Sequence, residues 1–537
     1  MSEALPADIR TVAPARDDGA APRTGMLGTW WGVPLVLVLG VVAPVVIFLT
    51  PGDGELDLTT WLQLGLTSYA GVRLAMLVIA GRIEPLQGVF WLFTYTAMGI
   101  ASLAQLVLDR YPAPVTGPRS SMTVAILLVL AGCVVFDVAA TVTRRREERR
   151  PPVEERDTDR VRVAGPVRVR LLVVAAVGAA AVMAQTLGGL SSLLSSRQGV
   201  SRSLEEAGLT ADGSLAGAAL LRGAGTVLPL VALLLLTRRL VADRSRWRDI
   251  NLVVVWAFVL VLNLVVNNPI ANPRFWFLTA ALATFFVMFP RSVTAFRIVL
   301  LGGLVASLVV FPYLDKFRYA DGSSTVEQDL SVLELISVKD YDQTVMTASA
   351  VDYVRTGPGH TYGRQLAGSA FFWVPRSIWA DKPQDTGVVL AQEMGAINLN
   401  RSAPLWAETY LDLGAGGMLA AFVLVGWASA RGDLLYRRRT TRPATARDPA
   451  GQPVAAIVAI GVPLVAGYEF ILLRGSLLQA MGRLAIGAGV LWLVSSWWTR
   501  RPQAARTRPR TRHHVTSALS PEPTTSPHAA PTTPPTT

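Results

Sequence analysis

The sequence predicts an all-α, polytopic membrane protein with about twelve transmembrane helices and a large late extracytoplasmic loop. Of its 537 residues, 51% are hydrophobic and only 16% are charged, and the mean hydropathy is +0.40. A soluble domain carries nearer a quarter charged residues. The apolar residues also form blocks of roughly 18–22 residues, the helical length that crosses a hydrocarbon core. Finally, the arginine-rich linkers all fall on one side when successive blocks alternate across a membrane.

Each apolar block is predicted to be one membrane span. Spans one to nine lie within 30–311, and spans ten to twelve lie within 403–498. In order, the predicted spans are 30–49, 58–80, 85–107, 122–142, 171–190, 215–236, 250–266, 275–289, 298–311, 411–430, 454–473 and 477–498. The eighth and ninth spans are short for a membrane crossing. Because every basic linker lands on the same side, the count is expected to be even.

The ends of the chain and its linkers set the topology. Residues 1–29 are polar, and 499–537 are rich in Arg, Pro, Thr and Ser, so both ends are predicted to be disordered. The first apolar block is long enough to span, so no cleavable signal peptide is expected. The positive-inside rule places both termini in the cytoplasm of a multi-pass cell-membrane protein. The cytoplasmic linkers would be 143–170, 237–248 and 431–452, with the acidic turn 51–57 and the 312–402 loop outside.

Several classes of function are excluded or disfavoured by composition. The net charge of +12 reflects the basic cytoplasmic linkers, so no nucleic-acid partner is expected. No GxxxxGK[ST] phosphate loop is present, which argues against a self-contained ATP-driven pump. The single cysteine, Cys133, allows no intrachain disulfide and no cysteine metal site. We expect neither a cofactor nor a metal site.

Ionisable residues inside or at the ends of spans are hypotheses of function, because their burial in lipid is unfavourable. They are Arg73, Arg222, Glu469 and Arg483, with Arg274 and Arg474 at outer helix ends. One interpretation is that the arginines extend to the interface or pair with Glu469. The other is that outer arginines bind an anionic lipid head group, since the guanidinium fork matches phosphate oxygens.

The 312–402 loop has two halves of opposite character. The first half, 312–352, is acidic and is expected to be a solvated face. The second half is basic and contains His360, the only histidine before the C-terminal tail. Its segment 356–383 combines aromatic residues with two prolines, which predicts a short interfacial or re-entrant helix followed by a turn. The alternative is a loop that merely packs on the bundle.

Two elements at this end of the chain resemble the O-antigen or oligosaccharide repeat-unit polymerases (Wzy type). PRSIWADKP (375–383) is similar to that family's "PR…KP" element, through Pro375, Arg376, Lys382 and Pro383. WAETYLDLGAGG (406–417) is similar to its second element, through Glu408, Tyr410, Gly414 and Gly417. Ala407 and Leu413 depart from the usual Gly and Phe. NPRFWF (272–277) resembles an earlier arginine element, so the resemblance covers roughly residues 270–420.

The resemblance implies a metal-independent, inverting glycosyl transfer of the GT-C kind. A polyprenyl-pyrophosphate-linked oligosaccharide would be the substrate, and a chain-length regulator and a flippase would be partners in the bilayer. The candidate catalytic residues are Arg376, Glu408 and His360. The candidate substrate-binding residues are Arg274, Lys382, Arg364, Arg401, Tyr410, Arg222 and Arg483.

The candidate roles follow from the reaction. Arg274, Arg376 and Lys382 would stabilise the departing pyrophosphate. Glu408 or His360 would act as the base toward the acceptor hydroxyl. Structural alternatives are that Glu408 only pairs with Arg376 or Arg401, and that Tyr410 only anchors its helix.

Three rival functions stay open. An O-antigen ligase would share the donor but use a different acceptor, and that family usually has His where Glu408 stands. A transporter or flippase of lipid-linked glycans would account for the intramembrane arginines. A membrane scaffold would use the loop to bind partners.

Overall fold

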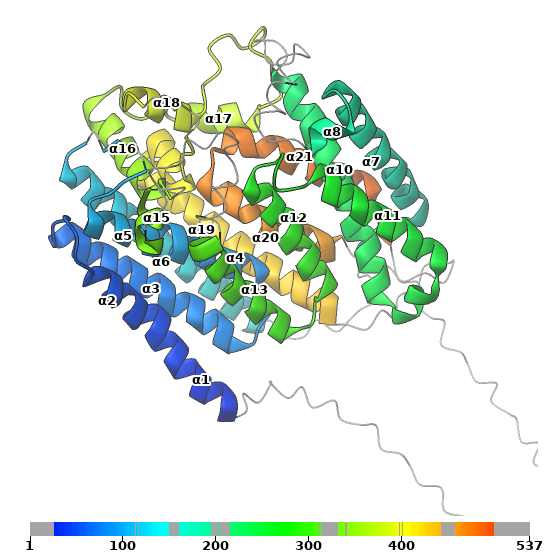
Figure 1. Cartoon of the computed structure of the whole chain (residues 1–537), viewed down its shortest axis with the longest axis horizontal. Helices are drawn as coiled ribbons and strands as arrows, with labels where there is room; N and C mark the ends of the chain where they lie inside the picture. Colours follow the sequence, from blue (N-terminus) through cyan, green and yellow to red (C-terminus); the bar gives the residue numbers. More distant parts are fainter. Residues whose placement is uncertain are drawn as a thin grey trace, which may run out of the picture.

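In the computed structural model the regular elements of the described residues are helices, apart from one two-stranded ribbon (Figure 1). It describes residues 26–112, 114–115, 117–149, 161–194, 203, 215–310, 312, 331–338, 341–396, 398–399, 401–441 and 457–498. The C-terminal tail and most of the N-terminal segment, both predicted to be disordered, lie outside these residues. Within them, nine helices are long and apolar enough to cross a membrane, and two more are apolar but shorter. The prediction of an all-α polytopic membrane protein is therefore confirmed.

The N-terminal part contributes four rods. The first is α1 (Met26–Leu37), η1 (Val38–Val42) and α2 (Ala43–Phe48), and the second is α3 (Leu58–Ala80). The third is α4 (Pro85–Phe93), η2 (Thr94–Ile100) and α5 (Ala101–Leu108), and the fourth is α6 (Arg119–Arg149). The segments η1 and η2 are π-helical turns within otherwise α-helical rods, so each rod crosses without a break.

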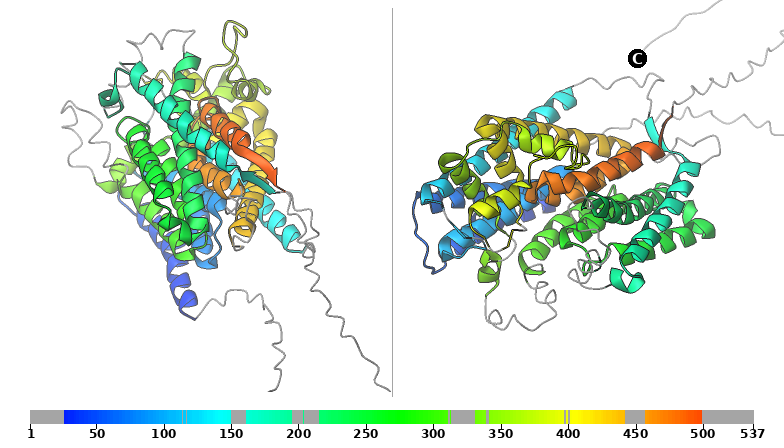
Figure 2. Two further views of the ribbon diagram at one scale, coloured as in Figure 1. Left: turned by 90° about the vertical axis from the view of Figure 1, so that its right-hand side faces the viewer. Right: turned by 90° about the horizontal axis from the view of Figure 1, so that it is seen from above.

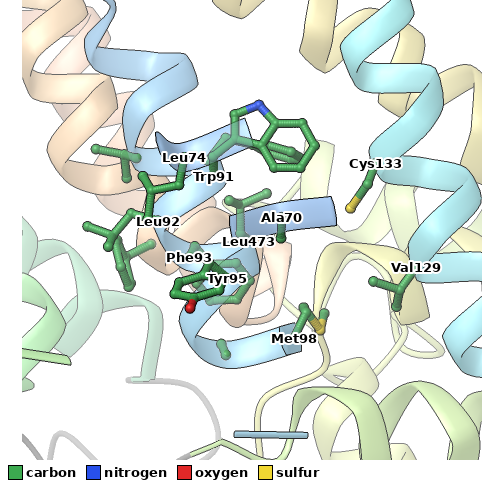
Figure 3. Close-up of a cluster of buried hydrophobic side chains, with 14 of the residues drawn as sticks. Ala70, Leu74, Trp91, Leu92, Phe93, Tyr95, Met98, Val129, Cys133 and Leu473 are labelled. Carbon is green, nitrogen blue, oxygen red and sulfur yellow. The ribbon is translucent and has the colours of Figure 1, made fainter. Parts of the chain in front are cut away.

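The third rod is the centre of this part of the bundle. Every residue from Ile83 to Val107 is buried, which explains why its sequence is apolar on all sides. Figure 3 shows its aromatic side chains beside α3, α6 and α20. Phe90 stacks on Phe136 with ring centroids 3.6 Å apart, and the Tyr95 hydroxyl donates to Leu39 O at 2.9 Å. Cys133 is buried in the same core.

Local signals explain where these rods begin and end. Asp57 precedes α3 and accepts a hydrogen bond from Thr60 N–H at 3.0 Å, which satisfies one free amide of the first turn. Gly81 ends α3 in the left-handed region at φ 63°. Pro85 then occupies the first position of α4, where its missing N–H is not needed.

The remaining helices form a second group beside the first (Figures 1 and 2). Its members are α7 (Pro166–Thr186), α8 (Leu190–Leu193), α10 (Leu215–Ala242), the 3-10 turn η3 (Arg244–Arg248), α11 (Ile250–Val266), α12 (Arg274–Met288), α20 (Val458–Arg474) and α21 (Leu477–Val494). The helix formed by α13 (Val293–Val305) and η4 (Ala306–Val310) packs against α4 of the first group. The long α19 (Leu405–Thr441) packs on α6 and α20.

A short antiparallel ribbon joins distant parts of the chain. Strand β1 (Val161–Ala164) pairs with β2 (Ser495–Trp498), so that Val161 faces Trp498 and Ala164 faces Ser495. The Arg168 guanidinium also donates to Leu493 O at 3.2 Å. These contacts fix the start of α7 against the end of α21.

The two ends of the bundle differ in charge. At the end that we call the basic end, Glu84 is held by Arg144 at 3.0 Å and Arg437 at 3.6 Å. Glu147 is held there by Arg431 and Arg438. The opposite end, which we call the loop end, carries the described part of the predicted 312–402 loop.

The loop end contains four short helices. They are α15 (Val332–Val338), α16 (Gln343–Thr356), α17 (Arg364–Ala370) and α18 (Thr386–Glu393). In the acidic half Ser331 and Val332 are exposed, but the prediction of a solvated face is wrong for residues 341–351, which are all buried. Their polar groups find partners in the bundle: Ser102 and Thr344 share a hydrogen bond of 2.5 Å, and Gln105 donates to Tyr341 O. The helix α16 is therefore part of the core.

Candidate functional site at the loop end

The first part of α19 is set apart by a break at Gly414. This residue has φ 70° and ψ −173°, values outside the helical region, so the helix has a kink at this point. A Cβ on Gly414 would also lie 3.4 Å from His360 Nε2. Both the backbone conformation and the close approach of His360 therefore favour glycine. The kink sets apart residues 405–413, which carry Glu408, Tyr410 and Asp412.

Glu408 lies buried against the start of α21. Glu408 is only 4% exposed, and its Oε2 accepts a hydrogen bond from Leu477 N–H at 2.9 Å. A helix N-terminus is a favourable place for a carboxylate, because its first amides lack helical partners. The sequence also allowed Glu408 to pair with Arg376 or Arg401. Those arginines have other partners, namely Lys382 O and Asp342.

Asp385 brings a second buried carboxylate to the same place. Its Oδ1 accepts from Gly387 N–H at 2.8 Å as the cap of α18, while its Oδ2 is buried without a well-formed hydrogen bond. Burial raises the pKa of Asp385, and the side chains of Ser476 and Gln479 at the start of α21 partly oppose this. Asp385 also lies within electrostatic range of Glu408. The hydroxyls of Thr386 and Ser476 are buried nearby, and neither has a well-formed hydrogen bond.

We call Asp385, Thr386, Glu408 and Ser476 the polar cluster. The sequence analysis identified only Glu408. Asp385 and Ser476 each stand directly before a helix, so the ordinary helix-capping signal could have drawn attention to them. Their shared location could not have been read from the sequence, because α18 and α21 are far apart in the chain.

Arginines gather near the short connection between α20 and α21. Arg474, the last residue of α20, lies over the ring of Phe275 at 4.7 Å, and Arg274 lies over the same ring at 5.6 Å. Burial raises the pKa of Asp342, and the nearby Arg474 and Arg401 oppose that rise. Arg401 approaches Asp342 Oδ2 at 3.7 Å and donates to Pro112 O at 2.9 Å. The loop end thus places Arg401 and Arg474 beside Asp342, and Arg274 and Arg474 against the same ring of Phe275.

Two further predicted arginines lie deeper in the bundle. Arg483 on α21 lies over the ring of Trp276 at 4.6 Å. Arg222 on α10 lies within electrostatic range of Arg483. Since Trp276 follows Phe275 in α12, these two arginines adjoin the group formed by Arg274 and Arg474. Arg73, by contrast, pairs with Asp137 and lies over Trp91, so its role is structural.

The segment that carries His360 is fastened to α19 by a residue that the sequence analysis missed. Asp412 is fully buried and accepts hydrogen bonds from the Thr361 hydroxyl and from the N–H groups of Gly363, Gln365 and Leu366. His360 Nδ1 lies 3.3 Å from Leu411 O, and its ring meets Tyr410 edge-on at 5.5 Å. Asp412 therefore ties the first part of α19 to residues 361–366 at the start of α17.

The basic residues of PRSIWADKP form a separate arm. We define the arm as residues 371–383, which project beyond the helices between α17 and α18 (Figure 1). Arg376 donates to Lys382 O at 2.8 Å, and Lys382 Nζ donates to Phe372 O and Val374 O at 2.7 and 3.0 Å. Arg364 pairs with Asp381 at 2.9 Å. Partial burial and the nearby Arg376 lower the pKa of Lys382.

The arm closes on itself through these bonds, so they hold Arg376 and Lys382 within the arm rather than against Glu408. Within the described residues, no group of three or more His, Cys, Asp or Glu side chains is placed to hold a metal ion. Comparisons of the chain with family models, curated proteins and solved structures found no match.

Proposed function

We propose that this chain is a membrane glycosyltransferase that polymerises polyprenyl-pyrophosphate-linked oligosaccharide repeat units on the outer face of the cell membrane. The observation that carries the proposal is Glu408, a buried carboxylate held by a helix N-terminus beside Asp385, at the end of the bundle that also carries Arg401 and Arg474 beside Asp342. The positive-inside rule makes the basic end cytoplasmic and the loop end extracytoplasmic, with both termini in the cytoplasm.

The proposed reaction is an inverting, metal-independent transfer. Glu408 accepts the proton of the acceptor hydroxyl as the hydroxyl oxygen bonds to the anomeric carbon of the donor glycan. The bond from that carbon to the phosphate oxygen breaks, and the polyprenyl pyrophosphate leaves with the electron pair. Negative charge then grows on the pyrophosphate, and positioned guanidinium groups in a poorly hydrated site stabilise it. Arg274, Arg401 and Arg474 are the proposed guanidinium donors to the leaving pyrophosphate.

The arm has a second proposed role. Its Arg376 and Lys382 are linked to each other and lie on a projecting segment. They would meet the pyrophosphate or the glycan from the aqueous side. His360 and Tyr410, which pack together beside the kink in α19, would position the acceptor unit. A flippase and a chain-length regulator are the proposed partners of the enzyme.

The test is elongation by purified protein in detergent, with lipid-linked repeat units as the only substrate. We expect products longer than one unit. Glu408→Gln should lower the rate about 10²–10⁴-fold, the range for loss of a general base, because glutamine keeps the bond to Leu477 N–H but accepts no proton. Glu334→Gln is the matched control, since Glu334 also lies at the loop end and pairs with Arg110. Equal rates in wild type and Glu408→Gln would exclude Glu408 as the base.

The same assay separates the rival functions. A transporter or flippase is favoured by Arg222 and Arg483, which lie within electrostatic range of each other in the bundle, but it would not lengthen glycans where no sealed membrane exists. A ligase would transfer the donor glycan only to a different acceptor. Absence of longer products with repeat units alone, followed by transfer to an added lipid acceptor, would replace polymerase by ligase.

A further inference from the structure

A cavity lies at the basic end, well away from the polar cluster. It has a volume of about 420 Å³, is lined by residues of α7, α10, η3 and the start of α11, and is partly open. Three arginines line it: Arg170, Arg239 and Arg246. Val173, Leu236 and Leu252 form part of its apolar wall. The cavity thus combines cations with hydrocarbon, as a site for an amphipathic anion would.

The two acidic residues near the cavity, Asp243 and Asp249, cap helices. Asp249 lines the cavity, but it caps α11 by accepting from Leu252 N–H at 3.3 Å, and it reaches Arg246 only at 4.0 Å. Asp243 caps η3 by accepting from Ser245 N–H at 3.0 Å. The lining contains three arginines and one carboxylate, so its formal charge is positive. A guanidinium group can bind two phosphate oxygens with a pair of hydrogen bonds. The arginines of the lining therefore suit a phosphate group as the ligand.

The surface next to the cavity indicates what kind of molecule carries the phosphate. Val255 lines the cavity, and the exposed apolar side chains of Val254, Phe258 and Val261 continue from it along α11. On α7, the exposed Leu171 and Val174 flank it in the same way. An acyl chain would lie along this apolar surface while its head group filled the cavity. A free phosphate ion would use only the arginines.

We propose that this cavity binds the phosphate head group of an anionic phospholipid of the cytoplasmic leaflet. The lipid would join α7, α10 and α11 at the basic end, where η3 connects two of them. The proposal rests on the cavity, its arginines and the adjoining apolar surface. It does not depend on the glycosyl transfer proposed above.

The test reconstitutes the full-length protein into vesicles of equimolar phosphatidylglycerol and phosphatidylcholine, then measures the lipid retained in detergent by native mass spectrometry. We expect the wild type to retain phosphatidylglycerol selectively. The double variant Arg170→Gln/Arg246→Gln should reduce that retention at least fivefold. The matched control is Arg244→Gln/Arg248→Gln, which removes two exposed arginines of η3 that do not line the cavity.

Three results would overturn the proposal: unchanged retention in the first double variant, equal loss in both, or equal retention of the two lipids. Stabilisation of the detergent-purified protein by inorganic phosphate to the same degree as by phosphatidylglycerol would show a soluble-anion site instead. If the first variant fails to fold, a phosphatidylglycerol with a photoreactive head group is cross-linked to wild type. Labelling must then fall within residues 169–173 or 236–255, and labelling elsewhere would also overturn the proposal.

Discussion

Buried carboxylates at the two ends of the bundle are held in different ways. At the basic end, Glu84 is 2% exposed and Glu147 is 8% exposed, and each is held by two arginines. At the loop end, Glu408 and Asp385 are 4% and 8% exposed, and their described hydrogen bonds come from backbone N–H groups. Similar burial is thus combined with ion pairing at one end and with helix caps at the other.

The difference in carboxylate partners indicates a structural role at the basic end and a binding role at the loop end. A carboxylate between two guanidinium groups joins the helices that carry them, which is a structural role. Glu408 and Asp385 are instead stabilised by backbone N–H groups and by neutral side chains such as Ser476, so their oxygens keep lone pairs for a further partner. The unsatisfied oxygen of Asp385 and the hydroxyls of Thr386 and Ser476 have the same character. Buried polar groups without partners are expected where a substrate supplies them.

The largest expected effect separates the two ends by stability. Glu84→Gln should lower the free energy of unfolding by about 3 kcal/mol, because Arg144 and Arg437 lose their partner in a buried site. Glu408→Gln should change it by less than about 1 kcal/mol, because the amide oxygen still accepts from Leu477 N–H. Thermal unfolding of both variants in the same detergent measures the difference. Equal losses would show that the two ends do not differ in this respect.

A smaller effect concerns the arm. Arg376→Ala should lower the elongation rate at least about tenfold, or about 1.4 kcal/mol, through loss of a cation that meets the substrate. Its exposed side chain bonds only Lys382 O among the described contacts, so unfolding should change by less than about 0.5 kcal/mol. Asp381→Asn, which breaks the exposed pair with Arg364 without removing a cation, is the control for disturbance of the arm. A fully active Arg376→Ala protein would remove Arg376 from the mechanism.

The smallest expected effect is a dependence on pH at Asp385. Because burial raises the pKa of Asp385, its contribution to stability is complete below the ordinary value of 3.8 and is lost as pH rises through the raised folded value. Asp385→Asn does not titrate and keeps an acceptor for Gly387 N–H. The melting temperature of the Asp385→Asn variant, relative to that of the wild type, should therefore increase as pH rises from acidic to neutral. A constant difference between the two proteins across that range would contradict this assignment.

Much of the fold could be predicted because apolar length alone defines a span. The predicted spans 58–80 and 250–266 coincide with α3 and α11, and 275–289 differs from α12 by one residue at each end. The buried α16 could not be predicted in this way. Its polar, small residues resemble a solvated helix, and their burial depends on partners such as Ser102, which lies far away in the chain.

The candidate site was predicted only in part. Glu408 and Arg274 were identified from chemistry at helix ends, where position in the chain indicates depth in the membrane. Asp385 and Asp412 were missed because their importance arises from which amides they reach. Asp137 is a different case, since it lies within a predicted span and a complete search for ionisable residues would have found it beside Arg73.

The ribbon of β1 and β2 has a consequence for how the protein is made. The first strand precedes α7 and the second follows α21, so most of the bundle is synthesised between them. During synthesis β1 therefore stays unpaired until α21 and β2 have been made. Pairing of β1 with β2 is therefore the last step of assembly. A chain that stops before Ser495 would insert its helices but would leave β1 without its partner strand.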